Sequence, residues 1–435
     1  MQTGITFGLQ LPRPWGPGSE RRLFAEALDQ VELADRLGFD HAWTVEQHFL
    51  EEYSHSSAPE LFLAAASQRT STIRLGHGVV LTPPGYNHPA RVAERIATLD
   101  LVSGGRVDFG FGDSKSRVEL EGFGVDAGAR RAMSLEAVEQ IADMMALEPY
   151  PGHRGEHFAM PARNVVPKPV QKPHPPLWIA CSDDATVQLA ARLGVGALAH
   201  SFFDAAEAAH VVAGYYETFR RECVPIGHVV NPAVAMVDPF YCHEDGATAT
   251  AVGMRAHGFR TYAARHYYSF GRHRPGYTDL AANAEVVRAE LGGDVPLRGG
   301  HAIGTPGEIA QHLRGLEAAG VDQVILTHQA GGLTHQQVCE SLELFAREVR
   351  PALLPGEQER LRRREAELAP HIAAALERKA RRQAPGRDAV PLCDAYGLSR
   401  ETDVELVGLA DMSESTRAAI LELNRLKAIA LRLEP

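Results

Sequence analysis

A histidine and a glutamate, His48 and Glu119, are the residues whose types and predicted positions best suit proton transfer. Each lies a few residues past the end of a β-rich run, at 41–45 and 106–111 respectively. An imidazole changes charge near neutral pH, and a carboxylate bound to it would fix its orientation and raise its basicity. Because the chain contains 20 histidines, a lone loop histidine can equally be structural, and the pairing depends on the fold.

The elements that must position these residues alternate between short β-rich runs and amphipathic helical stretches, as in a parallel sheet with crossover helices. Eight runs are predicted to be strands, at residues 5–9, 41–45, 73–81, 106–111, 177–181, 197–200, 233–240 and 323–327. Helices are predicted between them, for example at 21–37 and 89–101. Eight such strands predict the α/β class and a (β/α)₈ TIM barrel, in which functional groups lie in the loops that follow the strands.

Rim insertions and a C-terminal extension are expected around this barrel. Prolines and glycines predict a hairpin at 150–176 and a long irregular loop, a candidate lid, at 271–300. We expect a barrel domain at 1–353 and a helical tail at 354–435, with helices at 357–382 and 413–433 and a hinge at Pro385-Gly386. The tail is expected to pack on the barrel or on a second subunit. Docking of a reductase or a carrier protein is the alternative.

Composition limits the classes of partner. Hydrophobic residues at 45% and charged residues at 23% are typical of a folded, soluble domain, and a net charge of -11 argues against nucleic acid or a membrane as partner. Five scattered cysteines and the lack of an export signal predict a cytoplasmic protein. His153 and His157 have the spacing of metal ligands on a helix, but Gly152 and Gly155 place them in the hairpin, so no metal site is predicted.

The run WTVEQHF at 43–49 resembles the EHHF signature of bacterial luciferase and its relatives, with Gln47 in place of the first histidine. Further blocks agree in order and spacing: GHGVVL at 76–81, HPAR at 88–91, LD at 99–100, SGGR at 103–106, KPHPPLW at 172–178 and GTP at 304–306. Their ordered combination covers roughly residues 5–353. On these residues the chain resembles the bacterial luciferase-like family of flavin-dependent monooxygenases.

This resemblance implies a barrel that binds reduced FMN supplied by a separate flavin reductase. The flavin would react with O₂ to give a flavin hydroperoxide, which transfers one oxygen atom to a small organic substrate. His48 matches the catalytic histidine of the family, and Glu119 falls where luciferase has a carboxylate, so both are expected to be catalytic. A dry pocket with one positioned proton donor would protect the oxygenated flavin. A homodimer is also implied.

The resemblance assigns residues to the two ends of FMN. Gly78 and Val79 match a pair that carries a non-proline cis peptide behind the flavin ring, with an ordinary strand as the alternative. Ser182, Asp183 and Thr186 lie where a strand turns into a helix, so free N–H groups and the helix dipole favour an anion. Ser182 and Thr186 match hydroxyls that bind phosphate in the family. Capping of the helix by Ser182 or Asp183 is the alternative.

One departure concerns the loop after the fourth predicted strand. Where luciferase has an arginine that contacts flavin, this chain reads GDSKSR at 112–117, so an acid, Asp113, replaces the cation. Gly112 is expected to contact the cofactor. Asp183 adds a second acid near the phosphate, and Lys115 or Arg117 is expected to compensate. A diffusible reduced flavin would tolerate such a site better than a permanent cofactor.

Aromatic residues on the rim are candidates for shaping the substrate pocket, although aromatic residues at helical spacing more often serve the core. The candidates are Tyr53 and His55 in the loop at 49–59, and Tyr262, Tyr267 and Tyr268.

Two other functions stay open at this stage. One is a deazaflavin-dependent hydride-transfer oxidoreductase, and the other is a flavin-binding protein without catalysis, for which Asp113 and Asp183 are the motivation. A metal-dependent barrel hydrolase fits poorly, because residues 9–12 read LQLP and contain no HxH pair. No GxGxxG nicotinamide fingerprint is present, which favours a separate reductase.

Overall fold

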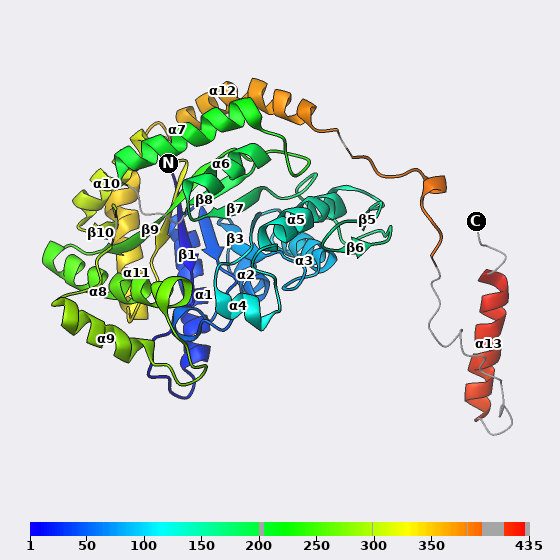
Figure 1. The fold of residues 1–435 in the computed structure, drawn as a ribbon, viewed down its shortest axis with the longest axis horizontal. Coiled ribbons are helices and arrows are strands. Elements are labelled where there is room, and N and C mark those ends of the chain that lie inside the picture. Colours follow the sequence, from blue (N-terminus) through cyan, green and yellow to red (C-terminus); the bar gives the residue numbers. More distant parts are fainter. Residues whose placement is uncertain (200–203, 298, 381, 394–412, 431–435) are drawn as a thin grey trace. The chain divides into compact units, whose positions relative to one another are not determined.

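Eight parallel strands close into a barrel in the computed structural model, which describes residues 1–199, 204–297, 299–380, 382–393 and 413–430 (Figure 1). In order around the barrel the strands are β1 (Gln2–Phe7), β2 (His41–Thr44), β3 (Arg74–Leu81), β4 (Val107–Gly112), β7 (Leu177–Cys181), β8 (Gly196–Ala199), β9 (Val234–Cys242) and β11 (Gln323–Thr327). Pairing of β8 with β9 closes the sheet. The predicted (β/α)₈ barrel is confirmed, and each predicted strand overlaps an observed one. Residue 200, the last of one predicted strand, lies outside the described residues.

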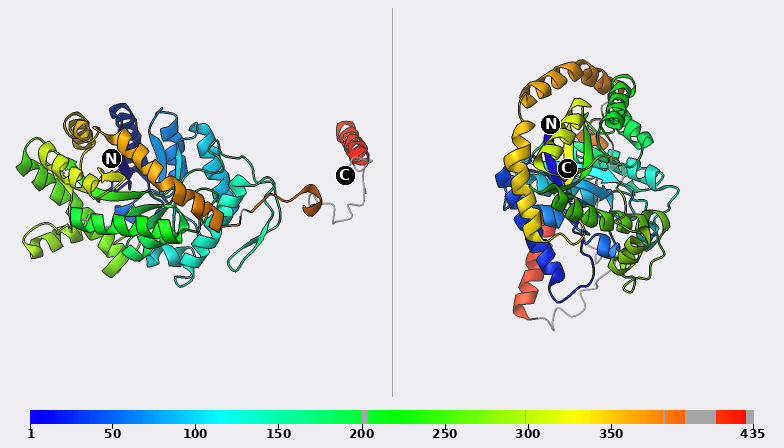
Figure 2. Two further views of the ribbon diagram at one scale, coloured as in Figure 1. Left: turned by 90° about the horizontal axis from the view of Figure 1, so that it is seen from above. Right: turned by 90° about the vertical axis from the view of Figure 1, so that its left-hand side faces the viewer.

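Helices cover the outside of the barrel (Figures 1 and 2). In α1 (Ser19–Leu37) the stripe of Leu23, Ala27 and Val31 is buried against the sheet, and Gly38 ends the helix with φ 80°. The other outer helices include α2 (Pro59–Ser67), α3 (Pro89–Val102), α5 (Arg130–Ala146), α6 (Asp184–Leu193), α7 (Ala205–Glu222), α10 (Pro306–Ala318) and α11 (His335–Leu344). A short strand that sequence analysis missed, β10 (Ala302–Gly304), pairs with the end of β9.

The rim holds the predicted hairpin, formed by β5 (His153–Arg154) and β6 (Ala159–Met160). The expectation of an irregular loop at 271–300 was wrong in part, because α9 (Leu280–Leu291) lies within it. Asp279 caps this helix by accepting a hydrogen bond from the Ala282 N–H at 2.8 Å, and Leu280 is buried. Before it, α8 (Gly246–Arg265) continues into a π-helical turn, η2 (His266–Phe270).

The chain forms two compact units by its contacts, Met1–Pro385 and Gly386–Pro435. The first unit extends past residue 353, where we expected the barrel to end, because α12 (Glu357–Arg378) packs on α7 and buries Leu368. Its Arg364 also pairs with Asp322 at 2.9 Å. The second unit contains α13 (Glu414–Ala430); the predicted end of that helix, residues 431–433, lies outside the described residues.

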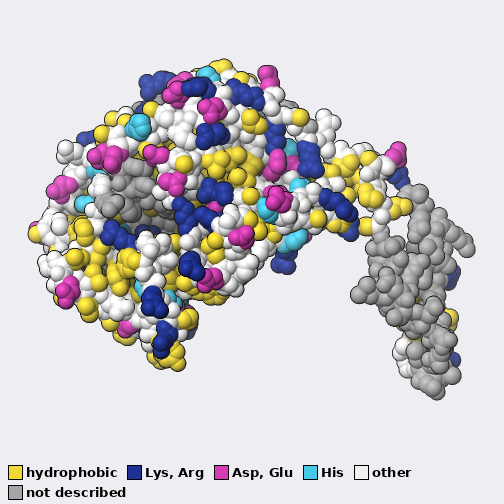
Figure 3. Space-filling model, viewed as in Figure 1, with side chains coloured by type: hydrophobic (Ala, Val, Ile, Leu, Met, Phe, Trp, Pro, Cys, Tyr) yellow, Lys and Arg dark blue, Asp and Glu magenta, His cyan; other side chains and the backbone are white. Residues whose placement is uncertain are grey.

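The described helices include none long and apolar enough to cross a membrane. Acidic and basic side chains are interspersed over the face of the molecule shown in Figure 3. Because opposite charges alternate, the local field at a site depends on individual side chains and their partners.

Candidate active site

A cavity of about 490 Å³ lies where the loops after the barrel strands meet, as expected for a site in this fold. Residues that follow β1, β2, β4, β7 and β11 contribute to its lining, together with the last turns of α8 and with the end of β3. Its polar and charged lining includes Glu46, Gln47, Lys115, Glu119, Arg131 and Ser182.

Glu46 accepts more hydrogen bonds than any other described carboxylate of this cavity. Only 7% of the residue is exposed, so these bonds replace those that water would make. Its Oε1 accepts hydrogen bonds from His48 Nε2 at 3.1 Å and Asn87 Nδ2 at 2.9 Å. Its Oε2 accepts one from the Leu81 N–H at 2.7 Å. These bonds tie the loop after β2 to the end of β3, and they fix one face of the cavity.

Glu119 does lie beside His48, but it does not hold the imidazole as we expected. Its Oε1 accepts a hydrogen bond from the main-chain N–H of His48 at 2.9 Å, and its Oε2 accepts one from Ser114 Oγ at 2.5 Å. The carboxylate that holds the imidazole is Glu46. Burial raises the pKa of Glu119, and the hydrogen bonds from Ser114 and His48 offset part of that rise. Glu119 is therefore a cavity-lining acid with a raised pKa.

The His48 imidazole is not among the side chains that line the cavity; its ring lies 4.9 Å from that of Phe123, edge to face. Its neighbour Gln47 does line the cavity and donates a hydrogen bond to the Tyr268 hydroxyl at 3.0 Å. Sequence analysis favoured His48 because it is ionisable, and it missed Glu46 and Gln47. The sequence feature that could have indicated Glu46 and Gln47 is their position in the same motif as His48, WTVEQHF at 43–49.

Gly78, Val79 and Gly112 form a second part of the cavity wall. The Gly78–Val79 peptide is cis, as expected. A Cβ on Gly112 would lie 2.6 Å from Val79 Cγ2, so only glycine lets these two strands approach as they do. This wall combines a small side chain with bare backbone.

The predicted phosphate end is formed by Ser182 and Lys115, whose Nζ lies 2.5 Å from Ser182 Oγ. Asp183 instead caps α6, accepting hydrogen bonds from the Thr186 N–H at 2.9 Å and the Thr186 hydroxyl at 2.6 Å. Those bonds hold the pKa of Asp183 near 2, with Lys115 contributing. Thr186 is buried and absent from the cavity lining. Its hydroxyl belongs to the cap in this structure, and the phosphate contact expected of it stays a prediction.

The two acids that seemed to oppose phosphate binding both have cationic partners. Arg131 lines the cavity and pairs with Asp113 at 2.7 Å, and Lys115 lies 3.2 Å from Asp183. Of the two cations expected to compensate, Lys115 lies in the cavity, whereas Arg117 is exposed and pairs with Glu121. Sequence analysis missed Arg131, since it lies on α5, far along the chain from Asp113.

The predicted aromatic contacts are divided between cavity and core. Tyr53 and Tyr268 line the cavity, whereas Tyr262 and Tyr267 are buried in a separate apolar cluster. His55 binds Glu20 at 3.2 Å and lies outside the cavity. In the β5–β6 hairpin, His153 binds Glu136 at 2.9 Å.

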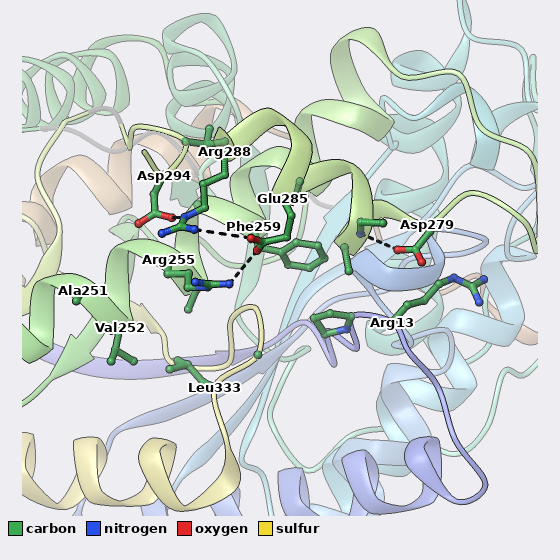
Figure 4. Close-up of a pocket in the computed structure, with 18 of the residues that line it drawn as sticks. Arg13, Ala251, Val252, Arg255, Phe259, Asp279, Glu285, Arg288, Asp294 and Leu333 are labelled. Atoms are coloured by element: carbon green, nitrogen blue, oxygen red, sulfur yellow. Dashed lines mark hydrogen bonds and ion pairs between the residues drawn. The ribbon is translucent and has the colours of Figure 1, made fainter. Parts of the chain in front are cut away.

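A second cavity, of about 830 Å³, lies on another face of α8, against α9 (Figure 4). Its arginines are all paired with acids: Arg255 with Glu285 at 3.0 Å, Arg288 with Asp294 at 2.8 Å, and Arg13 with Glu51 at 3.0 Å. The cavity therefore has little free charge.

A sequence model of the luciferase-like monooxygenases matches residues 5–323. The oxygenase component of a flavin-dependent trigonelline monooxygenase from Acinetobacter baylyi is 24% identical over 344 residues, covering 79% of this chain and 93% of that protein. Higher identities occur over shorter segments. A Sinorhizobium fredii protein is 36% identical over 173 residues, which span 40% of this chain and 49% of that protein.

Solved structures agree with this assignment. A Streptomyces bottropensis monooxygenase has 28% identity and a TM-score of 0.65, with 81% of this chain and 99% of that one covered. An F420-dependent secondary alcohol dehydrogenase shares the fold at 18% identity and a TM-score of 0.62, with 81% and 98% covered. Since the matched residues, 5–323, span most of the barrel and most of the chain, the protein belongs to the luciferase-like monooxygenase family.

Proposed function

We propose that this protein is the oxygenase component of a two-component monooxygenase that uses reduced FMN and O₂ to oxygenate a small organic substrate. The observation that carries the proposal is the order of groups around the barrel mouth. Glu46 follows β2 and Glu119 follows β4, glycines of β3 and β4 line one wall, and a lysine after β4 lies beside a serine after β7. The name of the Acinetobacter relative, an oxygenase component, supports a separate reductase.

The residues present fit FMN at both of its ends. Lys115 and Ser182, with Arg131 near them in the lining, offer the cationic and hydroxyl donors that a phosphate requires. Gly112 and the Gly78–Val79 peptide leave room for a flat ring to approach the backbone, which a Cβ on Gly112 would disturb.

When bound, reduced FMN supplies the electrons that activate O₂. We assign proton exchange with the substrate to the Glu119 carboxyl, because it lines the cavity and its pKa is raised. His48 is then a positioning residue: its main-chain N–H orients Glu119, and its imidazole orients Glu46. Gln47 and Tyr53 also line the cavity.

The test is an anaerobic titration with FMN reduced by a flavin reductase and NADH, followed by exposure to O₂. We expect wild-type protein to bind reduced FMN and to release H₂O₂ more slowly than free reduced FMN does. His48→Ala and Glu119→Gln should bind the flavin but release H₂O₂ faster.

Three outcomes would contradict the proposal. The first is failure to bind reduced FMN, and the second is substrate reduction by a reduced deazaflavin under strict anaerobiosis. The third is binding without any change in H₂O₂ release, which would indicate a flavin-binding protein without catalysis.

A further inference from the structure

One face of α8 carries two arginines into the candidate active site. Arg260, Thr261, Ala264, Arg265 and Tyr268, on α8 and the turn that follows it, all line the cavity of about 490 Å³. Residues at this spacing share one side of a helix. This end of α8 therefore forms one wall of the cavity, and two arginines lie on that wall.

Neither arginine has an acidic partner among the residues that the structure describes. Arg260 lies over the ring of Tyr53, with the guanidinium carbon 5.8 Å from the ring centre. Both side chains are only partly exposed. A guanidinium withdrawn from water without a counter-charge is unfavourable, so its retention at a site favours a ligand that supplies the charge.

The second cavity gives an internal comparison on the same helix (Figure 4). There, Arg255 pairs with Glu285 at 3.0 Å, and Arg288 pairs with both Glu285 and Asp294. On α8 itself, Arg255 is thus neutralised where the helix faces α9, whereas Arg260 and Arg265 form no ion pair with any described acid where the helix faces the candidate active site.

We propose that Arg260 and Arg265 bind a carboxylate carried by the substrate, so that the protein oxygenates organic acids. This inference rests on the proposed function for the oxygenation itself, but not for the binding. A guanidinium presents paired N–H donors that match the two oxygens of a carboxylate. Gln47 and Tyr268, hydrogen-bonded to each other at 3.0 Å, offer further polar contacts beside these arginines.

The other anion that could enter this cavity is the phosphate of FMN. Lys115 and Ser182 already provide donors for it between β4 and β7. The helix α8 follows β9, which is not adjacent to either of those strands in the barrel. Two separate cationic regions are consistent with two anionic groups, one on the cofactor and one on the substrate.

The experiment measures binding of benzoate, phenylacetate and cyclohexanecarboxylate, each against its uncharged primary amide, by calorimetry with and without FMN. The variants are Arg260→Ala, Arg265→Ala and the double variant, with Arg255→Ala as the matched control from the second cavity. We expect at least one acid to bind wild type about tenfold or more tightly than its amide. The double variant should lose this preference while keeping its affinity for FMN, and Arg255→Ala should keep both.

Several results would overturn the inference: no acid binds up to its solubility limit, amides bind as tightly as acids, or the double variant binds acids like wild type. Loss of FMN affinity in the double variant with acid binding retained would assign these arginines to the cofactor phosphate instead. The calorimetry without FMN separates this inference from the proposed function, because acids can bind to the FMN-free protein whether or not FMN is its cofactor. Thermal unfolding without ligand checks the variants, and removal of arginines without ion-pair partners should not lower the midpoint.

Discussion

The Glu46 carboxylate binds the imidazole of His48, with Oε1 and Nε2 3.1 Å apart, inside a buried network that also includes Asn87 and the Leu81 N–H. We expect Glu46→Gln to place an amide N–H against one of these donors. The free energy of unfolding should fall by about 1 to 3 kcal/mol, the cost of an unsatisfied buried polar group. Urea unfolding measures the change. Glu121→Gln, at an exposed pair with Arg117, should have little effect, and equal losses in both variants would refute the network's role.

The raised pKa of Glu119 predicts a pH dependence of turnover. If the carboxylate accepts a proton from the substrate, activity is present above this raised pKa and lost as pH falls through it, at a pH above the ordinary value of 4.5. Glu119→Gln should remove this acidic limb from the kcat/KM profile and lower kcat. His48→Ala should lower kcat but keep an acidic limb. A limb that survives in Glu119→Gln would assign the titration to another group.

Lys115 and Arg117 lie two residues apart in the same loop but differ in their access to the cavity. Lys115→Ala should weaken FMN binding roughly 10- to 100-fold, the effect of losing one charge-assisted hydrogen bond. Arg117→Ala should leave the affinity unchanged. Quenching of flavin fluorescence gives both dissociation constants. Equal effects would show that the loop acts only through its net charge.

Asp183 couples the stability of α6 to pH. Its pKa is lowered from 3.8 to about 2, mainly by hydrogen bonds from Thr186, so its contribution is complete above 3.8 and is lost as pH falls through about 2. Asp183→Asn keeps the capping oxygen and should flatten this acid dependence of the urea midpoint. Removing a negative charge beside Lys115 should also tighten FMN binding. An acid dependence identical to that of wild type would contradict the assignment.

Glu52 anchors the rim segment that follows η2. Its side chain is fully buried and accepts hydrogen bonds from the N–H groups of Leu280 at 2.5 Å and Ala281 at 3.1 Å. Glu52→Gln should speed hydrogen exchange at these two amides selectively. The comparison is Glu20→Gln, at a glutamate with 72% of its side chain exposed. Unchanged exchange at both amides would show that the segment is held by its apolar contacts alone.

The sequence by itself determined the barrel and its family. Eight β-rich runs separated by amphipathic stretches have periodicities that local burial dictates, and β7 and β11 coincide with their predicted bounds. The family resemblance also assigned Gly78, Val79, Ser182 and Glu119 to the site, and all four line the cavity. The helix α9 was missed, since only Leu280 and Ala284 along it are buried.

Tertiary structure decided which partner each functional group has. His48 and Gln47 are adjacent in sequence, yet of the two only Gln47 lines the cavity, because the His48 imidazole is hydrogen-bonded to Glu46. Arg131 on α5 neutralises Asp113 in the loop after β4, 18 residues earlier in the chain. Likewise, only the tertiary structure shows that Arg260 and Arg265 form no ion pair with any described acid. Such pairings depend on distances between elements remote in the chain, and hydrophobic periodicity carries no information about them.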